Sequence, residues 1–323
     1  MPLLITESVV QFREEGYAVV EGVFDPDTDF APIYAEWEAI LGGVADSLAA
    51  EGALSSLHEG LPFDQRLIAI CAESGRNIFQ PFDITLPQKD IRPETPLHVT
   101  AAVFDLLTHK RLLDVVEHLI GPEIVSNPVQ HVRMKPPSKA LGEAGQASYQ
   151  AAQVPWHQDQ GVLLEEADEA TILSCWVAVT DADESNGCMR VVPRSHRLHL
   201  HDHCPGDPQM GIPERLLSLD DAVVLPMQAG SALFFGQRVI HGSLDNTTDD
   251  QVRISMDLRY QPVGEPSGRP GFPSFLARSQ EHPELVLRDP QRWAEMWFEA
   301  RASLAGQGLP RFNRWDTDSP VCA

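Results

Sequence analysis

The pattern of apolar and polar residues changes about one third of the way along the chain. Before that point it predicts mainly helices, because apolar side chains recur at helical spacing over about residues 29–50 and 98–120. We expect Thr6 to cap an earlier short helix that stops at Gly16. The apolar run at 17–24 then predicts a strand.

From about residue 124 the apolar runs become short or alternating, and Pro, Gly, Asn and Asp separate them. Several short strands with turn residues and no helices between them are typical of an antiparallel barrel or sandwich. We therefore expect a mainly β fold with a helical layer (α+β). The predicted strands are 124–135, 171–180, 188–193, 222–227, 231–236, 238–244 and 251–262.

A Pro- and Gly-rich stretch at 262–273 precedes a last predicted helix, in which Asp289 is the cap and Pro290 the first residue. This helix carries an apolar stripe that we expect to pack against the core or an interface, formed by Trp293, Met296, Trp297 and Ala300. No repeat or low-complexity linker divides the sequence. We expect one domain over 1–323, with a mainly helical part at 1–123, the β core at 124–262 and a helical extension at 263–323.

The charge balance restricts the possible partners. The 323 residues include 24 Lys and Arg against 47 Asp and Glu, which gives a net charge of −23 and a pI of about 4.8. Nucleic acids and anionic membranes select basic surfaces, so neither is an expected partner. No window approaches 18 consecutive apolar residues, and the start of the chain lacks the features of a secretory signal. We expect a cytoplasmic monomer or homodimer that acts on a small molecule.

The cysteines are scattered and form no C-x-x-C pair. In a long chain this pattern predicts reduced intracellular thiols rather than a disulfide framework. We expect the two that lie in apolar runs, Cys175 and Cys188, to act as small buried hydrophobic residues. The other three are Cys71, Cys204 and Cys322.

The segment PWHQDQ contains a candidate metal site. On an extended chain His157 and Asp159 point to the same face, so that both can bind one ion. The best candidate for a third ligand is His241, which follows an apolar strand in VIHGS. Two histidines and one carboxylate that leave open positions on the metal form the ligand set of non-haem Fe(II) oxygenases. H-x-D alone is a weak signal, because it also occurs by chance.

The strand after His241 adds a second signal. Residues 253–259 alternate strictly, with Arg253, Ser255, Asp257 and Arg259 on one face and apolar residues on the other. We expect the apolar face to pack on helices and the polar face to point into a barrel. There Arg253 and Ser255 can bind a carboxylate through charge-assisted hydrogen bonds. The alternative for Arg253 is a surface salt bridge with Asp249 or Asp250.

These motifs, taken in order, resemble the phytanoyl-CoA dioxygenase family of Fe(II)/2-oxoglutarate oxygenases over residues about 8–262. The matching pieces are FREEGYAVVEGVFDPD, VRMKPPS, PWHQDQ, LSCWVAVTDADESNGCMRVVPRSH and AGSALFFGQRVIHGSLDNTTDDQVRIS. The chain departs from the family pattern at Ser231, where Asp is usual, and at Arg194, where Gly is usual. We expect neither departure to affect the metal.

The resemblance implies a fold and a set of site residues. The fold is a double-stranded β-helix, a cupin-like jelly roll in which the H-x-D strand pairs with the strand of the distal histidine. Fe(II) is then held by His157, Asp159 and His241. 2-Oxoglutarate chelates the iron and places its C5 carboxylate on Arg253 and Ser255. The cofactor-site candidates beside it are Trp176, which flanks the cosubstrate, and Gln130.

The implied activity is that of a dioxygenase, which releases succinate and CO2 while it hydroxylates or otherwise oxidises a substrate. Related halogenases replace the ligand carboxylate with a small residue, so Asp159 predicts oxygenation. The alternatives are a zinc hydrolase that uses the same three ligands and a catalytically silent binding barrel. Zn²⁺ outcompetes Fe²⁺ for such ligands, but a hydrolase has no need of Arg253.

Two further clusters have simpler explanations. SHRLHLHDH, with His196, His199, His201 and His203, could form a second metal site, but a polar loop is the favoured interpretation. The acidic run 165–169 could be a paired-carboxylate site, but a solvated loop beside the active-site mouth is favoured.

The substrate is the least constrained part of the prediction. An acyl-CoA needs a basic cluster for its phosphates, and Arg133, Lys135 and Lys139 provide only a thin one. We therefore favour a small or mid-sized organic metabolite, with acyl-CoA hydroxylation as the alternative. Gln130 and His131 point to opposite faces of their strand, and the sequence leaves open which one faces the site. The candidate substrate residues are His131, Arg133, Lys135, Trp156, Gln158 and Phe235.

Overall fold

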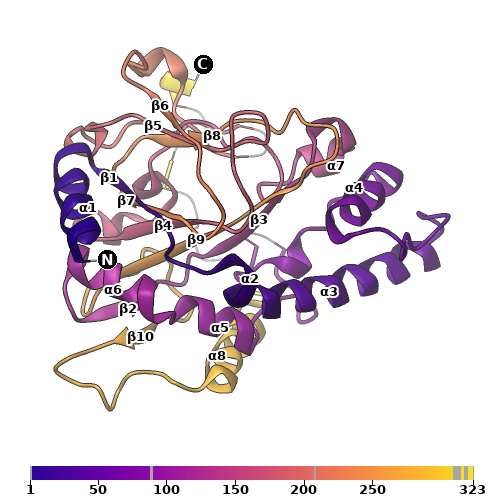
Figure 1. Ribbon diagram of the computed structural model, residues 1–323, viewed down its shortest axis with the longest axis horizontal. Helices are drawn as coiled ribbons and strands as arrows, with labels where there is room; N and C mark the ends of the chain where they lie inside the picture. The colour runs from indigo at the N-terminus through magenta and orange to yellow at the C-terminus, as the bar shows by residue number, and fades with distance from the viewer. Residues whose placement is uncertain (1, 88–89, 207–208, 308–313, 316–318, 323) are drawn as a thin grey trace.

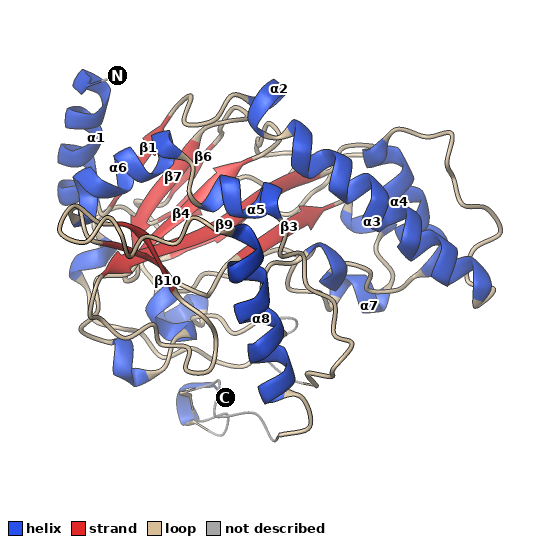
Figure 2. Cartoon of the chain, turned by 90° about the horizontal axis from the view of Figure 1, so that it is seen from below, coloured by secondary structure: helices blue, strands red, loops and turns tan. Residues whose placement is uncertain are grey.

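A computed structural model describes the chain except residues 1, 88–89, 207–208, 308–313, 316–318 and 323, and the side chains of 2–6. Within the described residues, no helix is long and apolar enough to cross a membrane. Helices from both ends of the sequence pack on the same side of the strands (Figure 2).

The helical part contains the expected helices together with some that were not predicted. A helix spans Pro2–Glu15, so Thr6 lies inside it and the predicted cap is wrong. The region predicted as one helix at 98–120 is two helices, with Thr100 capping the first and His109 separating them. The helices are α1 (Pro2–Glu15), α2 (Pro26–Asp29), α3 (Ala31–Ala50), α4 (Phe63–Ser74), α5 (Ala101–Leu107), α6 (Lys110–Ile120), α7 (Glu143–Gln146) and α8 (Pro290–Leu304).

Most strands pair in one large antiparallel sheet of order β1-β7-β4-β9-β2-β10, in which β3 also pairs with β9 (Figure 1). Its long central strand β9 has β4 along one edge and both β2 and β3 along the other. The strands of this sheet are β1 (Tyr17–Val20), β2 (Ile124–Ser126), β3 (His131–Lys135), β4 (Leu173–Ala178), β7 (Ala232–Gly236), β9 (Arg253–Pro262) and β10 (Phe275–Arg278). The predicted strand at 17–24 ends early, at Val20, and β10 was not predicted.

The second sheet is small, with the order β6-β5-β8. Its strands are β5 (Met189–Val191), β6 (Val223–Leu225) and β8 (His241–Ser243). An isolated antiparallel bridge joins His157 to His241 at its edge. Inward side chains of both sheets line one cavity, so the predicted jelly roll with a helical layer is confirmed.

The two faces of β9 explain how the barrel is built. Ile254, Met256, Leu258 and Tyr260 face outward and belong to the main hydrophobic cluster, which also contains the buried residues of α3, α5 and α6. The alternating residues are polar and point inward, which confirms the predicted amphipathic strand. β9 therefore separates an apolar core from a polar barrel interior.

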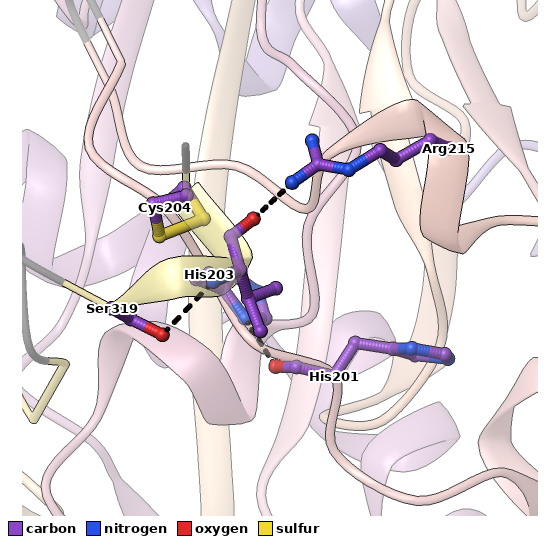
Figure 3. Close-up of a disulfide and its surroundings, with 7 residues drawn as sticks. His201, His203, Cys204, Arg215 and Ser319 are labelled. Atoms are coloured by element: carbon purple, nitrogen blue, oxygen red, sulfur yellow. Dashed lines mark hydrogen bonds between the residues drawn. A yellow bond between two sulfur atoms is a disulfide. The ribbon is translucent and has the colours of Figure 1, made fainter.

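The C-terminal part contains one confirmed and one wrong prediction. Asp289 caps α8 by accepting a hydrogen bond of 2.9 Å from the Gln291 amide, and Trp293 and Trp297 are buried. The expectation of reduced thiols is wrong for Cys204 and Cys322, which form a disulfide across 118 residues (Figure 3). The other three cysteines are free and buried. Spacing alone gave no signal for the disulfide, because its two cysteines lie far apart in the sequence.

Candidate metal and cosubstrate site

The three predicted metal ligands lie together inside the barrel. Nε2 of His157 lies 3.5 Å and Nε2 of His241 lies 3.7 Å from Oδ1 of Asp159. One ligand atom from each residue lies within 4.8 Å of the other two. The bridge between the two histidines, with N–H···O distances of 2.9 and 3.0 Å, brings these distant residues together.

Both imidazoles are oriented by backbone carbonyls. Nδ1 of His157 lies 3.0 Å from the Pro155 carbonyl oxygen, and Nδ1 of His241 lies 2.9 Å from that of Val239. Each Nδ1 is therefore assigned as the protonated donor, which leaves the lone pair of Nε2 free to bind a metal. Burial, together with the neighbouring His157, lowers the pKa of His241 to about 3. The imidazole of His241 is thus neutral, as metal binding requires.

The carboxylate of Asp159 is fixed by Arg259 and Ser174. Arg259 donates from Nη2 to Oδ1 at 2.8 Å and from Nε to Oδ2 at 3.1 Å, and Ser174 donates its hydroxyl to Oδ2. Burial opposes ionisation, but the charge of Arg259 holds the pKa of Asp159 well below its usual range. Both carboxylate oxygens are therefore held by the protein, and Oδ1 also faces the two histidines.

His203 positions the backbone between the two ligands of the H-x-D motif. Its Nε2 accepts a hydrogen bond of 2.9 Å from the Gln158 amide, and its Nδ1 lies 2.8 Å from the His201 carbonyl oxygen. The ring of Trp315 stacks on His203, and Trp315 Nε1 donates to the Gly161 carbonyl at 2.7 Å. The disulfide to Cys322 leaves from the residue next to His203 (Figure 3).

The histidine run therefore has a supporting role. Among the described residues, the only group of His, Cys, Asp and Glu spaced to hold a metal is His157, Asp159 and His241. The second metal site considered for His196–His203 is absent from this part of the chain. Asp168, from the acidic run, pairs with Arg314 near the C-terminus.

Arg253 lies in the same cavity with hydrogen-bonding capacity to spare. It is fully buried, and its Nη1 donates to Ser255 at 2.6 Å, while Nε and Nη2 have no partner among the described residues. Burial lowers its pKa to about 10, so that it stays charged at neutral pH. The alternative of a surface salt bridge is wrong, because Asp249 instead pairs with Lys139. The guanidinium lies 5.4 Å from the ring centre of Trp176, which also lines the cavity.

Lys135 lies beside this arginine rather than among exposed substrate contacts. Lys135 lies opposite Arg253 in the register of β3 and β9. Its Nζ donates to the Ser243 hydroxyl and the Leu244 carbonyl, each at 2.7 Å. Burial, reinforced by Arg253, lowers its pKa well below the usual value. Ser243, two residues after His241, also lines the cavity.

The remaining candidate residues divide into two groups. Arg133 and Phe235 line the cavity. Trp156 instead packs outside the barrel under Arg190, and the Gln158 side chain bonds to the loop at His199 and His201. Their places follow from alternation, since residues next to an inward His157 point outward.

Neither of the two residues left open by the sequence lines the cavity. Gln130 turns back to donate to Ser126 and the Asn127 carbonyl. His131 shares the inward face of β3, but its ring is held by Asp83 at 3.1 Å and packs on Tyr149. The basic cluster considered for a CoA phosphate does not form, because Lys139 pairs with Asp249 at the surface while Lys135 is buried.

Some functional residues were missed by the sequence analysis. The alternation of β9 placed Asp257 and Arg259 on the inward face, but nothing local indicated that Arg259 reaches Asp159. Ser174 and His203 carried no recognisable signal, because their contacts depend on how the two sheets face each other.

Comparison with known proteins agrees with this geometry. The family model "Phytanoyl-CoA dioxygenase (PhyH)" matches residues 12–255. The ectoine dioxygenase of Nocardia farcinica is 24% identical over 264 residues, which cover 75% of this chain and 73% of the relative. The human peroxisomal phytanoyl-CoA dioxygenase is 27% identical over 152 residues, which cover 45% and 42%.

Solved structures share the fold. The non-haem monooxygenase ThoJ matches with a TM-score of 0.54 and 20% identity, covering 91% of this chain and 96% of that one. The non-haem alpha ketoglutarate dependent epimerase SnoN from nogalamycin biosynthesis matches with a TM-score of 0.50 and 21% identity, covering 84% and 89%. The family model spans most of the sequence and includes all three residues that could hold a metal. The chain therefore belongs to the phytanoyl-CoA dioxygenase family, and it is an Fe(II)- and 2-oxoglutarate-dependent oxygenase.

Proposed function

We propose that His157, Asp159 and His241 bind Fe(II), and that the enzyme hydroxylates or otherwise oxidises a small or mid-sized organic metabolite. In this proposal the C5 carboxylate of 2-oxoglutarate binds Arg253 and Ser255, with Lys135 and Trp176 beside it. The observation that carries the assignment is the pair of buried, unpartnered nitrogens of Arg253 in the cavity of the three ligands. A buried guanidinium with free donors is costly unless an anion completes it.

The donor set supports iron. Two neutral imidazoles and one carboxylate on one side of an ion suit Fe(II) and leave positions open. The bound iron supplies the activation of O₂ that couples decarboxylation of 2-oxoglutarate to oxidation of the substrate. The protein orients the ligands through Arg259, Ser174 and the two backbone carbonyls, and the burial of the three ligands limits their contact with water.

The size of the substrate is inferred from the cavity and from the relatives. Among the relatives are ectoine dioxygenases and, at 24% identity over 195 residues, the 1-deoxypentalenic acid 11-beta-hydroxylase of Streptomyces arenae. One cavity must hold both the cosubstrate and the substrate, which favours a compact molecule. The separation of Lys139 from Arg133 and Lys135 weighs against an acyl-CoA.

Metal substitution tests this assignment against the zinc hydrolase considered from the sequence. Metal-free protein is loaded with Fe(II) or with Zn(II), and succinate release from 2-oxoglutarate is measured across a metabolite panel. We expect turnover with Fe(II) alone. Ester or amide hydrolysis with Zn(II), without any turnover of 2-oxoglutarate, would instead support the hydrolase.

The same assay tests the substrate class and the outcome. Strong stimulation by acyl-CoAs but not by free acids or other small metabolites would contradict the compact substrate. Because Asp159 is present, we expect oxygenated products, and chlorinated products in the presence of chloride would contradict the proposal.

A further inference from the structure

Asp257 lines the cavity of the candidate metal ligands and has one unsatisfied carboxylate oxygen. Its Oδ2 accepts a hydrogen bond from Arg133 Nε, but its Oδ1 is buried and has no partner among the described residues. A buried carboxylate oxygen without a donor is costly, because it has lost water and gained nothing in its place. Oδ1 therefore has the character of a site that a ligand's N–H or O–H completes.

Arg133 complements this oxygen from the neighbouring strand. Its Nε and Nη1 donate to Asp257 and to the Tyr149 carbonyl, and its Nη2 has no hydrogen-bond partner within the described part of the chain. Both side chains line the cavity that contains the metal ligands. Together they offer a cationic donor and an anionic acceptor side by side.

The pair is displaced along the barrel from Arg253 but adjoins Ser255, which lies opposite Arg133 across β3 and β9. Asp257 is four residues along β9 from Arg253, or about 13 Å, but only two residues from Arg259. Arg259 in turn holds the metal ligand Asp159. The 2-oxoglutarate dianion has no N–H or O–H group, so it cannot donate to the open oxygen of Asp257.

We propose that Arg133 and Asp257 anchor the substrate, and that the substrate is a small acid with an N–H or O–H donor next to its carboxylate. Amino acids and hydroxy acids share this chemistry. Arg133 Nη2 binds the carboxylate, and Asp257 Oδ1 accepts from the donor. This inference rests on the proposed function of the same site.

The charges of the cavity favour the same class. The charged residues that line it are Arg133, Arg253 and Arg259 against Asp159 and Asp257, which leaves one positive charge. Fe(II) and the 2-oxoglutarate dianion cancel each other. A zwitterion or a monoanion is therefore better accommodated than a cation.

The first test uses the unmodified protein with Fe(II) and 2-oxoglutarate. The probes are linear and cyclic amino acids, the matching 2-hydroxy acids, their methyl esters, and amines of equal size without a carboxylate. We expect the acids alone to stimulate succinate release and to bind in anaerobic calorimetry. The split between amino and hydroxy acids identifies the donor. If the esters or amines work as well as the acids, the inference fails.

The second test uses Asp257→Asn and Arg133→Gln. We expect the KM of a stimulating acid to rise about tenfold to a hundredfold in each variant. Asp257→Asn should affect acids that carry the donor more than analogues in which methyl groups replace all the donor hydrogens, a difference that a purely structural ion pair would not produce. The matched control is Asp114→Asn, which disrupts a partly buried ion pair with Arg278 away from the cavity. Equal losses for both kinds of acid would overturn the proposal.

The absorption band of the Fe(II)–2-oxoglutarate complex separates the two possible failures. If the unmodified protein forms no such band, the proposed function itself fails. If the band forms and only compounds outside the proposed class stimulate turnover, the substrate anchor alone is wrong.

Discussion

The inward face of β9 carries two buried arginines, Arg253 and Arg259. They differ in whether their guanidinium nitrogens have hydrogen-bond partners. Every guanidinium nitrogen of Arg259 has an acceptor within the protein, since the three donate to Asp159 and to the Val129 carbonyl. Arg253 is equally buried, but its Nε and Nη2 have no partner among the described residues. Both guanidinium groups lie in one cavity.

This difference separates positioning from binding. A buried guanidinium whose donors are all used holds part of the protein in place, here the carboxylate of a metal ligand. A buried guanidinium with free donors is a partial site, because its burial is compensated only when an anion arrives. The contrast therefore assigns different roles to two arginines that the sequence places six residues apart on one face.

The largest expected effect is on the KM for 2-oxoglutarate, when Arg253, the arginine with unpartnered nitrogens, is replaced. Arg253→Gln should raise the KM for 2-oxoglutarate about a hundredfold or more, since two charge-assisted hydrogen bonds to the carboxylate are lost. Fe(II) binding, measured by calorimetry, should change little because Arg253 does not touch the ligands. Arg278→Gln is the control, a partly buried arginine outside the cavity. Unchanged 2-oxoglutarate affinity would end the distinction between the two arginines.

Replacing Arg259, whose nitrogens all have protein acceptors, should instead lower the affinity for Fe(II). Arg259→Gln is expected to weaken Fe(II) binding about tenfold to a hundredfold, because the ligand carboxylate loses its orienting partner. Arg259→Lys should retain part of the affinity, since it keeps the charge without the fork. Ser174→Ala should have a smaller effect in the same direction. If Arg259→Gln changes 2-oxoglutarate binding more than Fe(II) binding, the assignment of roles is reversed.

The sequence predicted the parts of this arrangement that depend on local pattern. Strict alternation in β9 placed four polar residues on one face, and H-x-D with a distal histidine predicted the three residues that the structure brings close enough to hold a metal. The barrel strands were located to within a few residues for the same reason, since alternation survives in every strand that has one covered face.

The rest depends on contacts between distant segments. Whether the nitrogens of Arg253 and Arg259 find acceptors depends on which loop faces each side chain. No local sequence pattern contains that information. The cysteine prediction was wrong for a similar reason, since Cys204 and Cys322 are brought together only by the path of the C-terminal segment. The predicted helix at 98–120 is interrupted at His109. The apolar periodicity continues through this residue, but its backbone is not helical.

The pH dependence of stability tests whether a neutral His203 holds the H-x-D segment in place. Burial lowers its pKa to about 4, so the folded protein keeps it neutral as an acceptor for the Gln158 amide. The unfolded chain binds this proton at about pH 6.5, so stability is full above that pH and falls as the pH drops toward 4. At pH 5 the loss from this group is on the order of 2 kcal/mol.

Urea unfolding of the metal-free protein at pH 7.5 and pH 5 measures this loss. His203→Gln should reduce the difference between the two pH values, whereas His282→Gln, at an exposed position, should not. An equal pH dependence in all three proteins would show that the H-x-D segment is not held by a neutral His203.

A third arginine, at the surface, should have the smallest effect and the opposite sign. Arg194 has a φ of +64°, a left-handed conformation at the position where the family pattern has Gly. Its side chain is exposed and pairs only loosely with Glu15 and Asp221, at 3.7 and 3.5 Å, which contributes little. Arg194→Gly should therefore stabilise the protein by about 0.5–1 kcal/mol in urea unfolding. Arg197→Gly, at a negative φ, should destabilise it instead. A loss of stability in Arg194→Gly would mean that its ion pairs outweigh the backbone strain, and that even an exposed arginine here is held by its partners.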